Sequence, residues 1–125
     1  MPNSQTLCWC DIPVVDIDRA IDFYSKVLSI TLKKEEWGGH VMAVLPHSDE
    51  TVGCCLMKNQ HQQSKPSDHG PLIYLSVEGR LDAAEREVVN NKGKILQAKH
   101  SIGTYGFKSI VLDSEGNRIA LHSKS

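Results

Sequence analysis

The stretch DIPVVDIDRAIDFY at positions 11–24 decides how the fold begins. It overlaps an apolar run from Leu7 to Val14 that predicts a strand. Asp16 is a residue type that caps helices, and the apolar residues after it recur at helical spacing. These apolar positions are Ile17, Ala20, Ile21, Tyr24 and Leu28. The sequence therefore predicts a strand followed directly by an amphipathic helix.

The same order of elements occurs twice along the chain. After the first helix, short extended segments are predicted at 31–34, 40–45 and 52–57, and a segment rich in polar residues and proline at 59–70 reads as a linker. The second half predicts a strand at 72–77, a helix at 80–90 that Gly93 stops, and strands at 94–98, 107–112 and 118–122. Both halves are thus β-α-β-β-β units of about sixty residues. We predict one domain, 1–125, with module one at about 5–58, a linker at about 59–70 and module two at about 71–125.

Composition excludes several classes of function. The chain has 125 residues, of which 40% are apolar and 23% are charged, and its net charge is −1. It therefore lacks the excess of positive charge that is typical of proteins that bind nucleic acid or an anionic membrane. It contains no apolar run long enough to span a bilayer and no signal-like N-terminus, which predicts a cytoplasmic protein. Its four cysteines form two close pairs without C-x-x-C spacing, which favours buried thiols over a zinc site.

Two motifs resemble those of a known family. The segment 11–24 with Val27 and Leu28 resembles the opening strand and helix of the vicinal oxygen chelate (glyoxalase/bleomycin resistance/extradiol dioxygenase) superfamily, and DSEGNRIALH at 113–122 resembles its closing hairpin. The resemblance covers nearly the whole chain. It implies an α+β fold in which two tandem βαβββ modules form a curved mixed sheet, with helices on the convex face and a concave cavity. It also implies a homodimer. The superfamily includes isomerases, dioxygenases, epimerases and antibiotic-binding proteins, so it does not name a function.

The resemblance also implies where a metal would be held. Metal-dependent members take ligands from the first and last strands of each module, and the corresponding positions here are Trp9, Leu72 and Ala120. The last strand of module one, at 52–57, has neither histidine nor carboxylate. Indole, isobutyl and methyl groups do not coordinate cations, which predicts a protein without a metal or other cofactor. The alternative is a divalent ion held by displaced ligands, namely His122, His40 and Asp11.

Strand periodicity assigns residues to the two faces. Cys8, Cys10, Ile12 and Val14 are expected to face the helices, as are alternate residues of the strands at 72–77 and 118–122. A mixed set is left for the cavity, and we take it as the candidate ligand-binding set: Trp9, Asp11, His40, Tyr74, Arg118 and His122. The glycine-containing segment 100–106 is expected to be a loop at the cavity mouth.

Individual residues of this set leave alternatives open. Trp9 either stacks on a planar ligand or fills the space that a metal would occupy. Asp11 is either a general base or a solvated carboxylate at the end of a strand. No motif identifies a catalytic residue, so Asp11 and His122 are only candidates, His122 because it can move a proton near neutral pH.

The sequence therefore supports two hypotheses. In the first, the protein binds or sequesters a small organic ligand in the concave cavity without a metal. In the second, it is a glyoxalase-like isomerase or lyase acting on a small carbonyl compound, with or without a displaced divalent metal; a dioxygenase is disfavoured because that chemistry needs the metal. In both, the partners are a small molecule and a second copy of the chain, not nucleic acid or membrane.

Overall fold

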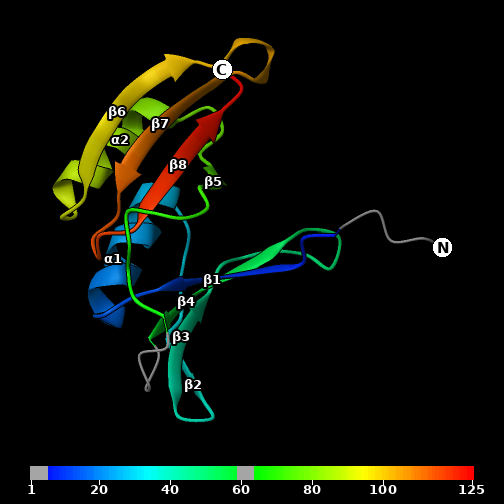
Figure 1. The fold of residues 1–125 in the computed structure, drawn as a ribbon, viewed down its shortest axis with the longest axis vertical. Coiled ribbons are helices and arrows are strands. Elements are labelled where there is room, and N and C mark those ends of the chain that lie inside the picture. Colours follow the sequence, from blue (N-terminus) through cyan, green and yellow to red (C-terminus); the bar gives the residue numbers. More distant parts are fainter. Residues whose placement is uncertain (1–5, 59–63) are drawn as a thin grey trace.

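The computed structural model describes residues 6–58 and 64–125, and it consists of two modules with the same order of elements (Figure 1). The first part of the predicted linker, 59–63, lies outside the described residues. Module one contains β1 (Trp9–Pro13), α1 (Ile17–Leu28), β2 (Glu35–Trp37), β3 (His40–Val44) and β4 (Gly53–Lys58). Module two contains β5 (Ile73–Ser76), α2 (Leu81–Asn90), β6 (Lys94–Ser101), the short 3-10 helix η1 (Gly103–Tyr105), β7 (Phe107–Leu112) and β8 (Arg118–Ser123).

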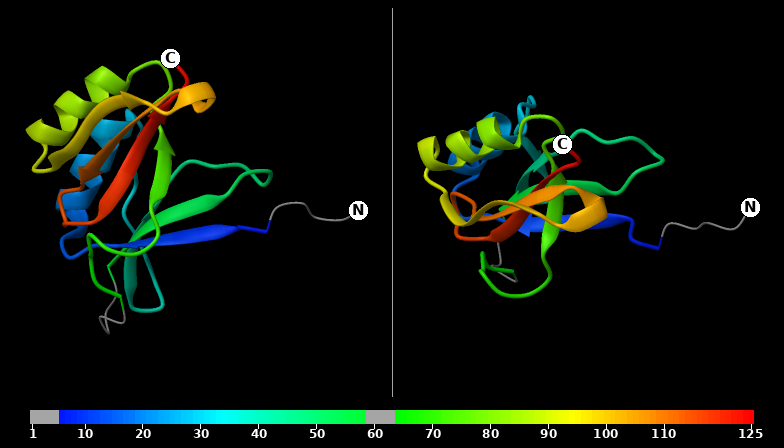
Figure 2. Two further views of the ribbon diagram at one scale, coloured as in Figure 1. Left: turned by 45° about the horizontal axis from the view of Figure 1, so that its top comes forward. Right: turned by 90° about the horizontal axis from the view of Figure 1, so that it is seen from above.

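Each module forms its own four-stranded mixed sheet. The strand order is β1-β4-β3-β2 in module one and β5-β8-β7-β6 in module two, with the first and last strands of each module parallel. The predicted α+β fold of two βαβββ units is confirmed. The strands do not form the single curved sheet that was expected, because no ladder joins the two sheets among the described residues. Helices α1 and α2 contact each other and lie on the same side of the molecule (Figure 2).

Helix α1 begins and ends where its sequence dictates. Asp16 has extended backbone angles, and its side chain accepts a hydrogen bond from the backbone N–H of Arg19 at 3.1 Å. The helix ends at Ser29, which adopts the left-handed conformation with φ of 55°, and the backbone N–H of Ile30 donates to the Ser25 carbonyl. The predicted strand-helix unit at the start of the chain is therefore confirmed.

The predicted strand at 31–34 is wrong, because the strand lies at Glu35–Trp37 instead. Gly38 and Gly39 both have positive φ, 59° and 82°, and form a two-residue hairpin that pairs Trp37 with His40. The turn thereby fixes which residues can pair with β3. Leu32, which lies within the predicted strand, packs against the core from an irregular segment instead.

Two features of module two also differ from expectation. β6 extends to Ser101, so the predicted loop at 100–106 is shorter and contains the single turn η1. Gly93 follows α2 as predicted, but the residue with positive φ is Lys92. Gly93 serves close packing, because a Cβ atom there would lie 2.6 Å from Phe23 Cε2 and 2.7 Å from the Leu112 carbonyl oxygen.

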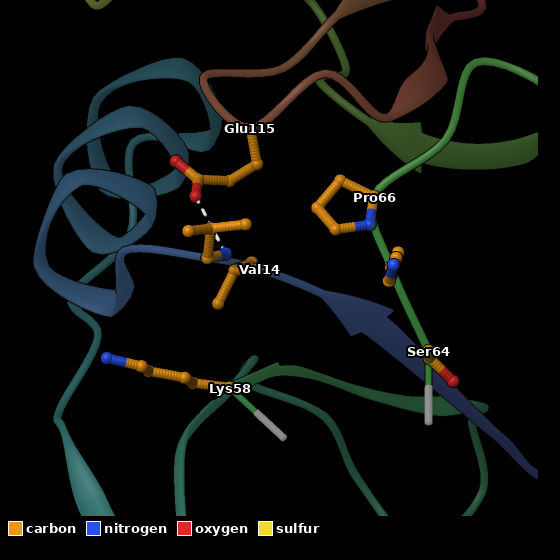
Figure 3. Close-up of a pocket in the computed structure, with 7 residues that line it drawn as sticks. Val14, Lys58, Ser64, Pro66 and Glu115 are labelled. Carbon is orange, nitrogen blue, oxygen red and sulfur yellow. Dashed lines mark hydrogen bonds between the residues drawn. The ribbon is translucent and has the colours of Figure 1, made fainter. Parts of the chain in front are cut away.

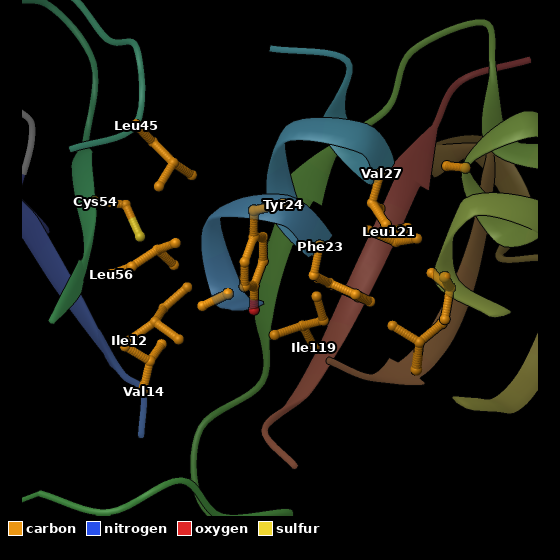
Figure 4. Packing of buried hydrophobic residues seen from close by; sticks show 14 of the residues in the cluster. Ile12, Val14, Phe23, Tyr24, Val27, Leu45, Cys54, Leu56, Ile119 and Leu121 are labelled. Carbon is orange, nitrogen blue, oxygen red and sulfur yellow. The ribbon is translucent and has the colours of Figure 1, made fainter. Parts of the chain in front are cut away.

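The core lies between the sheets and the helices. Figure 4 shows Phe23 and Tyr24 of α1 between side chains of module one, such as Leu56, and Ile119 and Leu121 of β8. Phe23 and Tyr24 are both fully buried, and their rings meet edge to face with centroids 4.9 Å apart. One helix therefore contributes to a core shared by both modules.

The predicted faces of the strands hold with one exception. Ile12, Val14, Val77, Ile119 and Leu121 belong to the buried cluster, with Cys10, Ile73 and Leu75 packed against it. Cys8 is exposed, contrary to expectation, because it precedes the first residue of β1. Within the described ranges, no helix has the length and apolar character needed to cross a membrane.

Candidate functional site

The open face of the module-two sheet has a cavity of about 550 Å³, lined by Tyr74, Ile102, Tyr105, Lys108 and His122. Strand pairing assembles it. Lys108 of β7 lies opposite His122 of β8, and residues paired in this way project to the same face of a sheet. Tyr74 of β5 lies opposite Ala120, the β8 residue two positions before His122. Two of the six predicted ligand-binding residues, Tyr74 and His122, therefore come together here.

Lys108 and Tyr74 form the polar side of this cavity. The Lys108 ammonium donates a hydrogen bond to the Tyr74 hydroxyl at 2.8 Å, and it lies 5.3 Å from the centroid of the Tyr74 ring. The Tyr74 side chain is half exposed, so its ring face remains open to a ligand. This pair combines a positive charge with an accessible aromatic surface.

His122 has one ring nitrogen engaged. Its Nε2 lies 2.6 Å from the Tyr105 carbonyl oxygen, and because a carbonyl only accepts, Nε2 is the protonated donor. This bond connects β8 to η1, which forms one wall of the cavity. A neutral His122 therefore keeps its Nε2 proton on the protein, and Nε2 is not free to act on a substrate.

Trp9 and Asp11 form a separate group on the open face of module one. The Trp9 indole N–H donates to Asp11 Oδ1 at 2.8 Å, and the Cys55 thiol donates to the same oxygen at 3.1 Å. The Trp9 ring lies over Gly53, where a Cβ atom would be only 2.3 Å away, and its edge meets the His47 ring. Trp9 is 43% exposed, so in this chain it forms a wall of the surface and does not fill a core.

The remaining predicted residues are dispersed. Arg118 and Asp11 both line a small cavity of about 140 Å³ between the two modules, and Arg118 Nη2 donates to the Gly70 carbonyl at 3.2 Å. His40 lies at the β2–β3 hairpin, opposite Trp37. Asp11 and His122, the two candidate catalytic residues, line different cavities.

A third cavity, of about 570 Å³, lies where the end of β1 approaches residues 64–66 (Figure 3). Glu115 borders it, but both carboxylate oxygens of Glu115 are already used. They accept hydrogen bonds from the backbone N–H groups of Val15 and Asp16 and from the Arg19 guanidinium. This carboxylate holds the closing hairpin against the start of α1 and is not available to a ligand.

The residues do not fit the divalent ion that the fold family implies. Trp9, Leu72 and Ala120 offer no metal-binding atom at the corresponding positions. Asp11, His40 and His122 do not replace them, since the described part of the chain has no cluster of three or more histidine, cysteine or acidic residues that could hold a metal ion.

The cysteines are also poor ligands and nucleophiles. Burial is the main cause that raises the pKa of the Cys55 thiol, to about 12, and the neighbouring Asp11 carboxylate adds to it. Burial likewise raises the pKa of Cys10 and, more strongly, that of Cys54. Because the thiolate is the reactive and metal-binding form, these three groups are held in the unreactive state.

The candidate ligand-binding set omitted three residues of the module-two cavity: Ile102, Tyr105 and Lys108. A signal existed for Lys108, because β7 was predicted with its observed bounds. Side chains alternate between the two faces of a strand, so Lys108 lies on the face away from the buried residues Ser109 and Val111. The segment 100–106, which contains Ile102 and Tyr105, was expected at the cavity mouth, but nothing in the sequence singled out these two residues, because the path of η1 depends on contacts with β8.

Comparison with known proteins gives a consistent picture of the fold. A crystal structure of a glyoxalase/bleomycin resistance protein from Albidiferax ferrireducens T118 has a TM-score of 0.74 and 13% identity, covering 97% of this chain and 100% of that one. A glyoxalase-related enzyme from Fulvimarina pelagi has a TM-score of 0.71 and 11% identity, over 95% of this chain and 88% of that one. The E144Q mutant of glyoxalase I from Zea mays has a TM-score of 0.69 and 22% identity, over 94% of this chain and 46% of that one.

These identities establish the fold alone. A search of curated proteins found no significant match. The family model described as the Glyoxalase/Bleomycin resistance protein/Dioxygenase superfamily matches residues 6–121, which is nearly the entire chain and includes both motifs that suggested the resemblance. The chain therefore belongs to the glyoxalase/bleomycin resistance protein/dioxygenase superfamily.

Proposed function

We propose that the protein binds a small organic molecule in the module-two cavity and does so without a divalent metal at the positions that the family uses. The observation that carries this proposal is the cavity of about 550 Å³, in which Tyr74, Tyr105 and Ile102 offer apolar surface beside the polar groups of Lys108 and His122. Apolar walls with a few convergent polar groups are typical of ligand sites.

Two features support binding over acid–base turnover. An isomerase or lyase that used Asp11 and His122 would need both on one substrate, whereas they line different cavities. His122 Nε2 also donates to the Tyr105 carbonyl, which leaves only Nδ1 of the neutral ring to accept a proton from a substrate. The arrangement therefore favours a site that holds a molecule over one that transforms it.

We further propose that the protein is a cytoplasmic homodimer. The open face of module one carries the exposed side chain of Trp9, which a second copy would cover. A cytoplasmic location is supported by the four cysteines, all of which are free.

The dimer has a direct test. One chain has a mass of 13.9 kDa, so light scattering at micromolar concentration should give about twice that value. A mass of one chain across the whole concentration range would contradict the dimer.

Binding is tested with a set of planar aromatic compounds, charged and neutral, by titration while backbone amide signals are recorded by NMR. Binders should shift the signals of Tyr74, Tyr105, Lys108 and His122, and Tyr74→Ala should weaken their binding about tenfold, which is about 1.4 kcal/mol. Trp37→Ala is the matched control, because Trp37 is an exposed aromatic residue on the β2–β3 hairpin, outside this cavity. Shifts confined to other regions, or an equal loss in both variants, would contradict the assignment of the site.

A further inference from the structure

We propose that the ligand of the module-two cavity is an aromatic carboxylate, whose negative group is bound by Lys108 and Tyr74 together. This inference rests on the proposed function and adds the chemical class of the ligand. It follows from three properties of the site: its charge, the direction of its hydrogen bonds and the shape of its apolar surface.

The first property is an unopposed positive charge. His100 of β6, Lys108 of β7, His122 of β8 and Ser76 of β5 are successive cross-strand partners, so they form one row across the open face of the sheet. The adjacent row of paired residues is Tyr74, Ala120, Ile110 and Gln97. Neither row contains an aspartate or glutamate. Lys108 forms no ion pair with any residue that the structure describes, so its charge is available to an anion.

The second property is that the polar edge of the cavity offers donors. The ammonium of Lys108 has three N–H donors, and only one is used in the bond to Tyr74. In that bond the Tyr74 oxygen is the acceptor, which leaves the Tyr74 O–H free to donate elsewhere. Donors on two atoms that lie 2.8 Å apart, Lys108 Nζ and the Tyr74 hydroxyl oxygen, thus remain for a ligand. A carboxylate matches them because its two neighbouring oxygens only accept hydrogen bonds.

The number of charges also matters. Lys108 supplies a single full positive charge, and Tyr74 beside it is a neutral donor. A singly charged carboxylate would be neutralised there, whereas a doubly charged phosphate would carry one charge that Lys108 does not neutralise. The site therefore favours a monoanion.

The third property is the apolar surface next to these donors. Tyr74 is 48% exposed, and Tyr105 of η1, which also lines the cavity, is 76% exposed. Ile102 adds apolar surface to the cavity. A planar ring attached directly to the carboxylate would lie against Tyr74 while its oxygens reach Lys108, and stacking on an aromatic face favours flat molecules.

The test compares 2-naphthoate with 2-naphthamide, which has the same shape but no charge, by calorimetric titration of the complete protein. Naphthoate should bind about fivefold more tightly, as expected for one partly exposed ion pair. In Lys108→Met this preference should disappear while naphthamide binds as before, and Lys108→Arg should restore it. Lys99→Met is the matched control, because Lys99 lies on the neighbouring strand with its charge near Asp82, 3.7 Å away.

The outcomes separate this inference from the proposed function. If both compounds bind equally well at the Tyr74 cavity, the site is a binding site but the carboxylate assignment is wrong. If neither compound nor any other aromatic probe binds there, the proposed function itself fails. A naphthoate preference that survives in Lys108→Met would also overturn the inference. The preference of the wild-type protein and its decrease at high salt need no variant, so the test remains decisive if Lys108→Met does not fold.

Discussion

Glu115 should contribute a large, pH-dependent part of the stability of this protein. Its side chain is inaccessible to solvent, and it forms a salt bridge with Arg19 at 2.7 Å in addition to its bonds to the backbone N–H groups of Val15 and Asp16. Burial alone would raise the pKa of the Glu115 carboxyl. The hydrogen bonds from Arg19 and from the two backbone groups outweigh that effect and lower the pKa from 4.5 to about 2.

The magnitude follows from this difference in pKa. At about 1.4 kcal/mol for each pH unit, the ionised carboxylate stabilises the folded state by about 3 kcal/mol at neutral pH. Because the folded-state pKa is lower than the unfolded-state pKa, this stabilisation is complete above about pH 4.5. It is lost progressively as the pH falls towards 2.

The assay is urea unfolding of the wild-type protein and of Glu115→Gln between pH 7 and pH 2.5. At pH 7 the variant should be less stable by about 3 kcal/mol, and the two free energies of unfolding should converge as the pH is lowered. Glu36→Gln, on an exposed strand position, should match the wild-type protein throughout. A constant difference between Glu115→Gln and wild type at every pH, or no difference at pH 7, would refute the reasoning.

Three further predictions concern stability. Tyr24→Phe should cost about 2 kcal/mol in urea unfolding, because it removes the buried hydrogen bond of 2.5 Å to Asp113, whereas Tyr105→Phe, on an exposed residue, should cost nothing measurable. Trp9→Ala should cost only about 1–2 kcal/mol because the indole is 43% exposed; a loss of about 3–5 kcal/mol, as in a core truncation, would show that Trp9 fills a core after all. Exhaustive treatment with a chelator should leave the melting temperature unchanged, and elemental analysis that finds about one divalent metal ion per chain would contradict this.

Sequence patterns were most informative where the structure depends on neighbours along the chain. The cap at Asp16 and the apolar spacing of α1 need only a few adjacent residues, and both were predicted correctly. The strand predicted at 31–34 was wrong because the hairpin at Gly38 and Gly39 determines the pairing with β3, and Leu32 packs against the core from an irregular segment. The two-residue turn of this hairpin places Trp37 opposite His40 and moves the strand towards the turn.

The candidate site was predictable only in part. Alternation correctly put Trp9 and Asp11 on one face of β1 and Tyr74 on the open face of β5, away from the buried cluster. It could not show that these residues belong to two separate surfaces. That separation arises because α1 packs against α2 and shares its core with both modules, which is a set of contacts between residues far apart in the sequence.

The sequence by itself determined the family, the order of the elements and the absence of metal-binding side chains at the family positions, since each depends on residue type and local spacing. The tertiary structure decided which polar groups meet. Lys108 lies beside Tyr74 only because β7, β8 and β5 align in one register, and His122 is held by Tyr105 only because η1 folds back over β8. Strand register and loop path are set by long-range packing, in which a shift of one residue would turn every side chain of the strand to the other face.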